Sequence, residues 1–223
     1  MAFKVIKENI LGANDNIASK IREELAGKNI LMVNIISSPG AGKTSFLEKV
    51  GPILKKENIP FVVLTGDCFT SRDAERLDRL DLEVVQINTD GACHIDAKLV
   101  NTALKSLDIG GKDLVIVENV GNLVCPASFD LGEDVKIAFL STAEGHDKPM
   151  KYPLLVRESG LAIINKTDLM DHVDFDMDFS VRCILDINPG IKIIKSSCKT
   201  GEGINDFIDW IKDRIKIKKE KKT

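Results

Sequence analysis

The segment SSPGAGKT, residues 37–44, decides the fold class of this chain. It follows the apolar run ILMVNII and precedes a segment of helical period, which is the strand–loop–helix context of a phosphate-binding loop. Backbone N–H groups of such a loop, together with the N-terminus of the following helix, surround phosphate oxygens. Ser37 stands where the usual first glycine would be, which affects the entry turn and leaves the phosphate cradle intact.

Individual residues of this P-loop have predicted roles. Lys43 is placed to contribute a positive charge between the β- and γ-phosphates of a nucleotide, and the Thr44 hydroxyl is placed to bind Mg2+. Gly40 and Gly42 allow backbone conformations and close approaches that a Cβ would block. The predicted phosphate-binding set is completed by Ser38, Ala41 and Ser45.

Short apolar runs alternate with segments of helical period along the whole chain. The runs are ILMVNII, PFVVLTG, EVVQIN, DLVIVEN, VKIAFLS, GLAIIN and GIKIIKSS, and the helical segments include KTSFLEKVGPILKKEN, SRDAERLDRL and DAKLVNTALKSL. Strands of mostly β-branched residues that alternate with helices indicate a parallel sheet covered on both faces. The sequence therefore predicts an α/β fold of the P-loop NTPase type, with a mostly parallel sheet of about seven strands.

The tetrapeptide NKTD, residues 165–168, predicts the base that the site reads. The Asp168 carboxylate can accept hydrogen bonds from guanine N1–H and from the exocyclic amine of guanine, whereas adenine presents an acceptor at N1. Lys166 can lay its aliphatic stem along the base, and Asn165 can brace the loop. We therefore expect GTP to be preferred over ATP.

A second base-reading segment, SSCKTGEG, follows the run IKIIK. Ser197, Cys198 and Lys199 resemble the Ser-Ala-Lys segment through which GTPases meet the guanine oxygen with a backbone N–H. The three motifs occur in order, each at the end of a predicted strand, and together they predict a GTPase domain over residues 28–223 with a basic tail. Residues 1–27 are predicted to form a helical extension packed on that body.

Two acidic positions have predicted roles in hydrolysis beside Lys43. In VIVENVGN, Glu118 ends a strand and Gly121 follows three residues later, the position of the usual Asp-x-x-Gly that holds Mg2+ through water and senses the γ-phosphate. Asp67, in LTGDCFTSRD, follows another strand and can orient the attacking water or complete the Mg2+ shell. The alternative for Asp67 is an ordinary acid at a helix N-terminus, and Asp73 competes for its role.

Cys93 and His94 are adjacent soft metal ligands in INTDGACHIDAKLV. Neighbouring side chains of a regular strand point to opposite faces, so only a loop could turn both toward one ion. Cys125, in NLVCPAS, is the candidate third ligand, and the set suits Zn2+ or Ni2+. Spacing alone favours the alternative that these are buried apolar cysteines; Cys68 is a candidate switch-region thiol and Cys183 a core residue.

Composition excludes several other classes of function. The net charge of −3 gives no reason to expect nucleic-acid binding, and no run of about 18 apolar residues predicts a membrane span. The first residues lack the features of a signal peptide, and five cysteines without a tight repeat do not form a disulfide framework. We therefore expect a cytoplasmic protein with no nucleic-acid or membrane partner.

The segment STAEGHDKPMKYP, residues 141–153, adds specificity to these motifs. Together with the P-loop, Glu118-Asn-Val-Gly121, NKTD, Cys93-His94 and Cys125-Pro126, it resembles the HypB family of hydrogenase maturation GTPases, in the SIMIBI class of P-loop GTPases. The resemblance extends over residues from about 28 to 212.

This resemblance implies a GTP-dependent metallochaperone switch that assists nickel insertion into a [NiFe]-hydrogenase precursor. It also implies a homodimer formed in the GTP state, with the interface metal site supplied by Cys93, His94 and Cys125 of both chains, and HypA and the hydrogenase large subunit precursor as partners. Lys148 and Lys151 would be cationic fingers or, alternatively, solvated lysines.

The chain also departs from the family pattern. Many members carry an N-terminal Cys-x-x-Cys-Gly-Cys site or a histidine-rich tract, and residues 1–28 contain neither Cys nor His, so tight nickel storage there is not predicted. The alternatives are a related GTPase that serves urease or another metalloenzyme, and a metal-binding scaffold whose nucleotide site controls assembly.

Overall fold

The computed structural model describes residues 10–67 and 71–220. Cys68, the predicted switch-region thiol, and the outermost parts of the predicted extension and basic tail lie outside the described residues.

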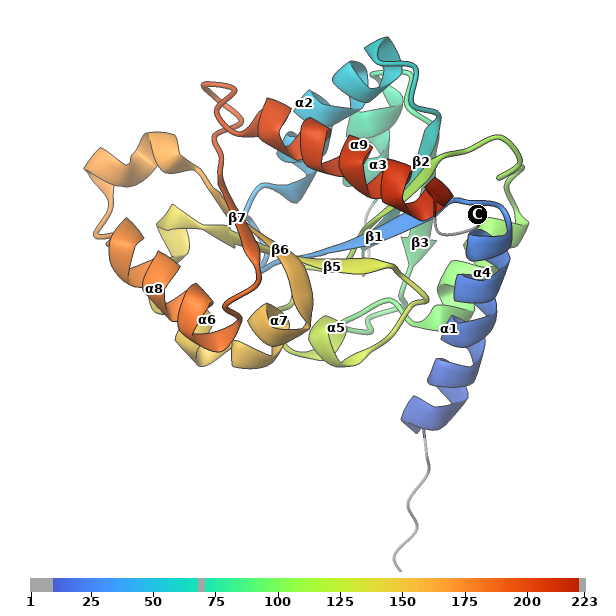
Figure 1. The fold of residues 1–223 in the computed structure, drawn as a ribbon, viewed down its shortest axis with the longest axis horizontal. Helices are drawn as coiled ribbons and strands as arrows, with labels where there is room; N and C mark the ends of the chain where they lie inside the picture. Colours follow the sequence, from blue (N-terminus) through green and yellow to red (C-terminus); the bar gives the residue numbers. More distant parts are fainter. Residues whose placement is uncertain (1–9, 68–70, 221–223) are drawn as a thin grey trace, which may run out of the picture.

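Figure 1 gives the arrangement of the elements. The strands are β1 Leu31–Ile36, β2 Phe61–Asp67, β3 Val84–Asn88, β4 Leu114–Glu118, β5 Val135–Ser141, β6 Ser159–Asn165 and β7 Lys192–Lys195. The helices are α1 Ile10–Gly27, α2 Lys43–Lys56, α3 Arg72–Asp78, α4 Ala97–Lys105, α5 Cys125–Ser128, η1 Thr142–Glu144, α6 Lys148–Lys151, α7 Pro153–Glu158, η2 Thr167–His172, α8 Met177–Ile187 and α9 Ile204–Glu220.

The strands form one seven-stranded sheet in the order β3-β2-β4-β1-β5-β6-β7. Every neighbouring pair runs parallel, so the predicted α/β fold with a mostly parallel sheet is confirmed, and within the described residues the sheet is wholly parallel. The central strand β1 is buried along its whole length, as its sequence, apolar except for Asn34, predicts.

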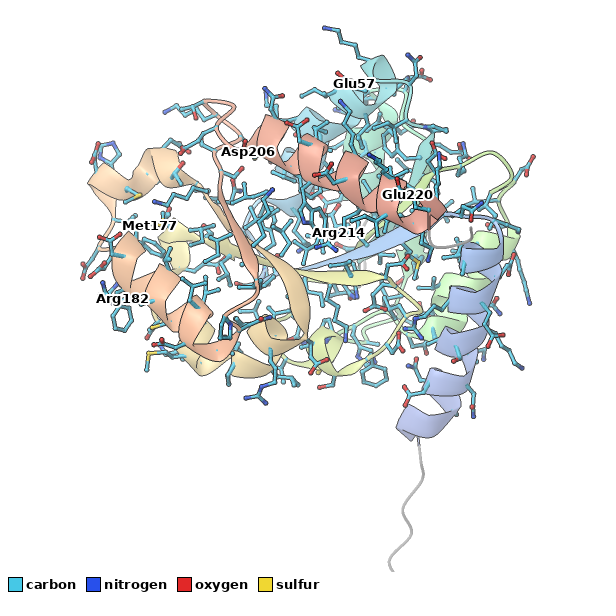
Figure 2. All side chains as sticks on the ribbon, in the orientation of Figure 1. Glu57, Met177, Arg182, Asp206, Arg214 and Glu220 are labelled. Atoms are coloured by element: carbon cyan, nitrogen blue, oxygen red, sulfur yellow. The ribbon has the colours of Figure 1, made fainter. Side chains whose placement is uncertain are left out.

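Helices cover both faces of the sheet (Figure 1). One face carries α2, α3 and α9, and its core includes Phe46, which contacts Phe139 and Phe207 edge-on with ring centroids 5.2 and 5.0 Å apart. Figure 2 labels Glu57 at the end of α2 and Arg214 on α9, which lie on this same face. The other face carries α1 and α4 over one half of the sheet and α5, α7 and α8 over the other half.

The N-terminal helix α1 lies against α4 (Figure 1). Asn14 Oδ1 accepts a hydrogen bond from the backbone N–H of Ala97, and Asn14 Nδ2 donates to the carbonyl of Asp130. Arg22 also pairs with the Asp130 carboxylate at 2.6 Å. The division into an extension and a GTPase domain stays a prediction. Within the described residues no helix has the length and apolarity to cross a membrane.

Parallel strands bring all their carboxyl ends to one edge of the sheet. The segments that follow the seven strands therefore all emerge at this edge, and the sequence motifs lie in these segments. The chain passes from β1 outward to β2 and β3, returns to β4 and crosses to β5, so the order reverses around β1. Such a reversal is the usual place for a ligand site in an open α/β sheet.

A buried carboxyl group lies beneath the sheet centre. Glu133 is 6% exposed; its Oε1 accepts a hydrogen bond from Asn34 Nδ2 at 3.2 Å and its Oε2 from the backbone N–H of Leu131 at 2.6 Å. Burial raises the pKa of Glu133 above its ordinary value, more than Lys136 and the hydrogen bonds lower it.

This raised pKa predicts how stability changes with pH. The folded chain holds the Glu133 proton more tightly than the unfolded chain, so the contribution to stability is complete below the ordinary pKa of 4.5 and is lost as pH rises toward the folded pKa. Glu133→Gln removes this titration. We expect the unfolding free energy of wild type, measured by urea titration without nucleotide, to fall relative to that of the variant as pH rises above about 4.5. A difference that does not change with pH would contradict the prediction.

Candidate nucleotide and metal site

A cavity of about 520 Å³ opens where the P-loop meets the carboxyl ends of β2 and β4. We call it the P-loop cavity. It is lined by predicted residues from four separate segments: Gly40, Gly42, Lys43, Thr44, Ser45, Asp67, Glu118, Gly121 and Lys166. A larger cavity, of about 770 Å³, lies at the opposite, amino ends of β5 and β6 and contains none of the predicted site residues.

The cationic and hydroxyl groups of the P-loop already have partners. Lys43 Nζ donates to Ser37 Oγ at 2.8 Å, so the serine at the usual glycine position holds the lysine beside the loop. Burial lowers the pKa of Lys43, and the nearby Glu118 carboxyl opposes this shift. Thr44 Oγ1 donates to Glu118 Oε1 at 2.7 Å. The structure therefore brings together the hydroxyl and the carboxyl that were predicted to bind Mg2+.

The Glu118 side chain is the most strongly perturbed acid of the cavity. Burial raises its pKa to about 7, although Lys43 and the Thr44 hydroxyl favour the ionised form. Its Oε2 is buried and, in the part of the chain that the structure describes, has no hydrogen-bond partner. A hard divalent cation prefers oxygen ligands of this kind, so the residues present fit a Mg2+ site.

Two acids compete for the role of positioning water. Asp67 and Asp73 both line the P-loop cavity, Asp67 from the end of β2 and Asp73 from the first turn of α3.

The NKTD segment is fastened to the P-loop. Asn165 Nδ2 donates to the carbonyl of Ala41 at 2.9 Å, and Lys166 Nζ donates to the carbonyl of Gly40 at 2.7 Å. Lys166 adopts a left-handed backbone conformation with φ of 63°. Gly42 has φ of 102°, a backbone conformation that favours glycine, and a Cβ there would lie 2.7 Å from Asn165 Nδ2.

The second segment that is predicted to read the base contacts the first. Ser197 Oγ donates to Asp168 Oδ1 at 2.5 Å and accepts from the backbone N–H of Lys199 at 3.2 Å. The Cys198 thiol lies 3.7 Å from Asn165 Oδ1. Two segments about 30 residues apart thus form one surface next to the P-loop, as a base-binding site requires.

The three predicted soft ligands come together. Cys93 and His94 lie in the loop after β3, and Cys125 begins α5 after β4. The sulfur atoms of Cys93 and Cys125 and a ring nitrogen of His94 all lie within 4.8 Å of one another, and Cys93 Sγ is 3.6 Å from His94 Nδ1. The His94 ring rests against the Phe129 ring with centroids 3.8 Å apart. We call these three residues the ligand cluster.

The protonation of the ligand cluster suits a thiophilic cation. Burial lowers the pKa of His94, which favours the neutral imidazole that binds metals. The hydrogen bond with the Cys125 thiol raises the pKa of Cys93, so a metal must displace thiol protons as it binds. Two sulfurs and one nitrogen leave at least one position of a Zn2+ or Ni2+ ion for a further ligand.

The other cysteines and histidines have different environments. Cys183 is 8% exposed on the core side of α8, where the sequence predicted a core residue. His172 is exposed, whereas the His146 ring contacts Phe179 with centroids 5.2 Å apart and accepts from the backbone N–H of Asp176.

Comparison with known proteins decides the family. The model for "CobW/HypB/UreG, nucleotide-binding domain" matches residues 31–195. The chain belongs to this family. The hydrogenase maturation factor HypB of Azotobacter vinelandii is 43% identical over 206 residues, which cover 92% of this chain and 68% of that protein. The hydrogenase/urease maturation factor HypB of Helicobacter hepaticus is 36% identical over 213 residues, with coverage of 94% and 87%. The crystal structure of HypB from Helicobacter pylori in complex with nickel has a TM-score of 0.87 and 33% identity, with coverage of 92% and 95%.

Sequence reasoning missed two charged side chains beside the P-loop of this CobW/HypB/UreG family member. Arg76 of α3 lines the P-loop cavity and donates to Ser45 Oγ at 2.9 Å and to Glu48 Oε2 at 2.7 Å. Glu144 accepts from Ser38 Oγ at 2.5 Å, and burial raises its pKa. In the sequence, Arg76 looks like any solvent-exposed residue of an amphipathic helix, so no pattern indicated its role. Glu144 could have been identified, because it begins the EGHDKP stretch of the family-specific segment.

Gly121 shows how closely the two nucleotide-side loops of this family member approach. A Cβ at Gly121 would lie 2.9 Å from the backbone N and Cα of Pro39 in the P-loop, which cannot move aside as a side chain can. Gly121→Ala is therefore expected to displace the P-loop and to lower GTP affinity roughly tenfold or more, which corresponds to about 1.4 kcal/mol.

Titration with a fluorescent GTP analogue measures this effect. Gly27→Ala is the matched control, since a Cβ at Gly27 meets no atom within 4 Å. Equal affinities of Gly121→Ala and wild type would show that the two loops do not need this contact.

Proposed function

We propose that this chain is a GTP-hydrolysing switch that assists the insertion of nickel into a [NiFe]-hydrogenase precursor, and that it binds the metal at the interface of a GTP-dependent homodimer. The observation that carries the proposal is the ligand cluster, whose donor atoms lie within 4.8 Å of one another at the same sheet edge as the P-loop cavity. Relatives named HypB, one solved with nickel, support the nature of the client and the metal.

The residues of the chain supply most of what phosphoryl transfer to water needs. The P-loop N–H groups and Lys43 would bind and orient the β- and γ-phosphates, with Lys43 exchanging Ser37 Oγ for a phosphate oxygen. Thr44 and Glu118 would hold Mg2+, which neutralises charge on the phosphate oxygens when bound. Asp67 or Asp73 would orient the attacking water, and Asp168 would select guanine.

The ligand cluster has features that favour completion by a second copy of the chain. Its three donors leave an ion unsaturated, and Cys93 is exposed. Val124, next to Cys125, is an apolar residue that is 57% exposed. A two-fold dimer would bring two clusters together and cover this surface.

Nucleotide and metal would then be linked through assembly. If GTP favours the dimer and the dimer binds metal more tightly, each ligand raises the affinity of the other, and hydrolysis removes that support. GTP cleavage thereby becomes metal release to the client. HypA and the hydrogenase large subunit precursor are the proposed partners.

A specific observation favours a second client. The Helicobacter hepaticus relative is named a hydrogenase/urease maturation factor, so delivery to a urease is the alternative function of the same switch. Capture of tagged wild-type chain with a hydrogenase large subunit or with a urease apoprotein separates the two clients.

Nickel content and mass in solution, measured on the same samples with GDP and with a non-hydrolysable GTP analogue, test the switch. We expect the analogue to produce a dimer with more nickel per chain than the GDP form, and phosphate release from GTP to show hydrolysis. Equal mass and equal nickel in both nucleotide states would overturn the proposed switch, and the chain would then be a nucleotide-controlled scaffold or a GTPase without metal cargo.

A further inference from the structure

One loop serves both sites. The segment that follows β4 begins with Glu118 in the P-loop cavity, passes Gly121 against Pro39, and reaches Cys125 of the ligand cluster. Asn119 and Asn122 stand on either side of Gly121. A change in the nucleotide cavity that moves Gly121 must therefore also move these two asparagines.

Asn119 ties this loop to the loop that carries Cys93 and His94. Its Oδ1 accepts hydrogen bonds from the backbone N–H groups of Val120 at 2.9 Å and Ile95 at 3.2 Å. Val120 precedes Gly121, and Ile95 follows the ligand His94. A single amide oxygen, that of Asn119, therefore connects Val120, the neighbour of Gly121, with Ile95, the neighbour of His94. The Asn119 residue is 1% exposed.

The orientation of the Asn119 amide is fixed from behind. Its Nδ2 donates to Asn34 Oδ1 at 3.1 Å, and Asn34 Nδ2 donates to Glu133 Oε1 at 3.2 Å. Asn34 is wholly buried on β1, the strand that leads into the P-loop. In this series of hydrogen bonds, each amide N–H faces an oxygen acceptor. Rotating the Asn119 amide would therefore leave buried groups unpaired, which costs about 1–3 kcal/mol for each group.

Asn122 makes a second connection between the same two loops. Its Nδ2 donates to the carbonyl of Cys93 at 3.2 Å, and its Oδ1 accepts from the backbone N–H of Val124 at 2.9 Å. Asn119 and Asn122 thus hold the Cys93–Ile95 segment at both ends. Ile95 also packs closely against Gly66, the residue before Asp67 of the cavity. A Cβ on Gly66 would lie only 2.5 Å from Ile95 Cδ1.

Small shifts of these loops matter for metal binding. The donor atoms of the ligand cluster lie within 4.8 Å of one another, whereas ligand atoms at about 2.3 Å from a tetrahedral ion are about 3.8 Å apart. A movement of the loop after β3 against the loop after β4, by a fraction of this spacing, therefore decides whether the cluster closes on an ion.

We propose that Asn119 and Asn122 are positioning residues that transmit the state of the nucleotide cavity to Cys93, His94 and Cys125. This inference rests on the proposed function, because it specifies how the switch reaches its metal. The asparagines act through the two loops that they join and need no contact with nucleotide or metal.

The test measures the coupling between the two ligands. Calorimetric titration with Ni2+ at saturating nucleotide gives the ratio of the nickel Kd with GDP to that with a non-hydrolysable GTP analogue. For wild type we expect a ratio of at least about 5, the lower end of common allosteric couplings. Asn119→Ala and Asn122→Ala are each expected to bring the ratio to less than half the wild-type value, and Asn119→Asp, which keeps the acceptor for Ile95, is expected to restore part of it.

Asn14→Ala is the matched control. Asn14 is a buried asparagine that also accepts from a backbone N–H of this region, that of Ala97, but it lies on α1 and, among the described residues, has no bond to the nucleotide-side loops. It is expected to keep the wild-type ratio. Because Asn122 is only half-buried, Asn122→Ala decides the question even if Asn119→Ala does not fold.

The outcomes separate this inference from the proposed function. A wild-type ratio of about 1 overturns both. A wild-type ratio of 5 or more that Asn122→Ala and Asn119→Ala retain leaves the switch intact and overturns the role of the asparagines. A ratio that falls equally in Asn14→Ala also overturns it, because the loss would then be general to this part of the fold.

Discussion

Asp168→Asn is expected to lower the affinity of the chain for GTP by at least about 10³-fold and to raise its affinity for xanthosine triphosphate. Asp168 Oδ1 is held by the Ser197 hydroxyl at 2.5 Å, so the carboxylate has a fixed orientation in the proposed base site. Guanine offers two adjacent N–H donors to a carboxylate, and the amide of asparagine would oppose one of them with its own donor. Xanthine has a carbonyl oxygen at that position and restores the pairing.

Competition between a fluorescent GDP and unlabelled GTP, ATP and xanthosine triphosphate measures this change. Asp171→Asn is the control, because Asp171 is an exposed acid in the same short helix η2. If Asp168→Asn kept its GTP affinity within about threefold, the base would have to be read elsewhere, since a removed buried pair costs far more than that.

Cys125→Ala and Cys93→Ala are each expected to weaken nickel binding by at least about 100-fold. Loss of an outer-sphere partner of a metal ligand already costs about 10–100-fold, and these variants remove a donor atom itself. Each chain would then offer two donors, His94 and one thiolate, instead of three.

Titration with Ni2+ in the presence of a non-hydrolysable GTP analogue measures both variants. Cys183→Ala is the matched control, a buried cysteine on α8 that is not part of the ligand cluster. Nickel affinity that survives both substitutions would mean that the cluster is structural and that the cargo binds elsewhere.

The sequence was sufficient for the fold because the strands of a doubly covered sheet are apolar on both sides. Runs such as ILMVNII and GLAIIN have no polar face, and they became the buried strands β1 and β6. The P-loop and NKTD segments were placed at strand ends for the same reason, since polar residues begin where the buried run stops.

The spacing of Cys93, His94 and Cys125 in the sequence was not sufficient to predict the ligand cluster. Cys93 and His94 would point apart in a strand, and they meet because β3 ends at Asn88 and the following loop turns both donors toward Cys125. The path of that loop depends on buried bonds from Asn119 and Asn122, which are long-range contacts without a sequence pattern. The family resemblance, not periodicity, supplied the assignment.

Local sequence patterns also could not predict the contacts of the charged residues beside the P-loop. Arg76 follows an ordinary amphipathic spacing, and only the fold directs it to Ser45 and Glu48. The replacement of the first P-loop glycine by Ser37 was visible, but its bond to Lys43 was not.

The bonds Lys43–Ser37 and Thr44–Glu118 also bear on the entropy of nucleotide binding. Ordering a flexible side chain at a binding site costs about 0.5–1.5 kcal/mol, and here folding has already restricted both side chains before a nucleotide arrives. Binding becomes an exchange of one oxygen partner for another instead of a disorder-to-order transition. The P-loop cavity is in this sense preorganised, so recognition should vary mainly with the enthalpy of the exchanged bonds.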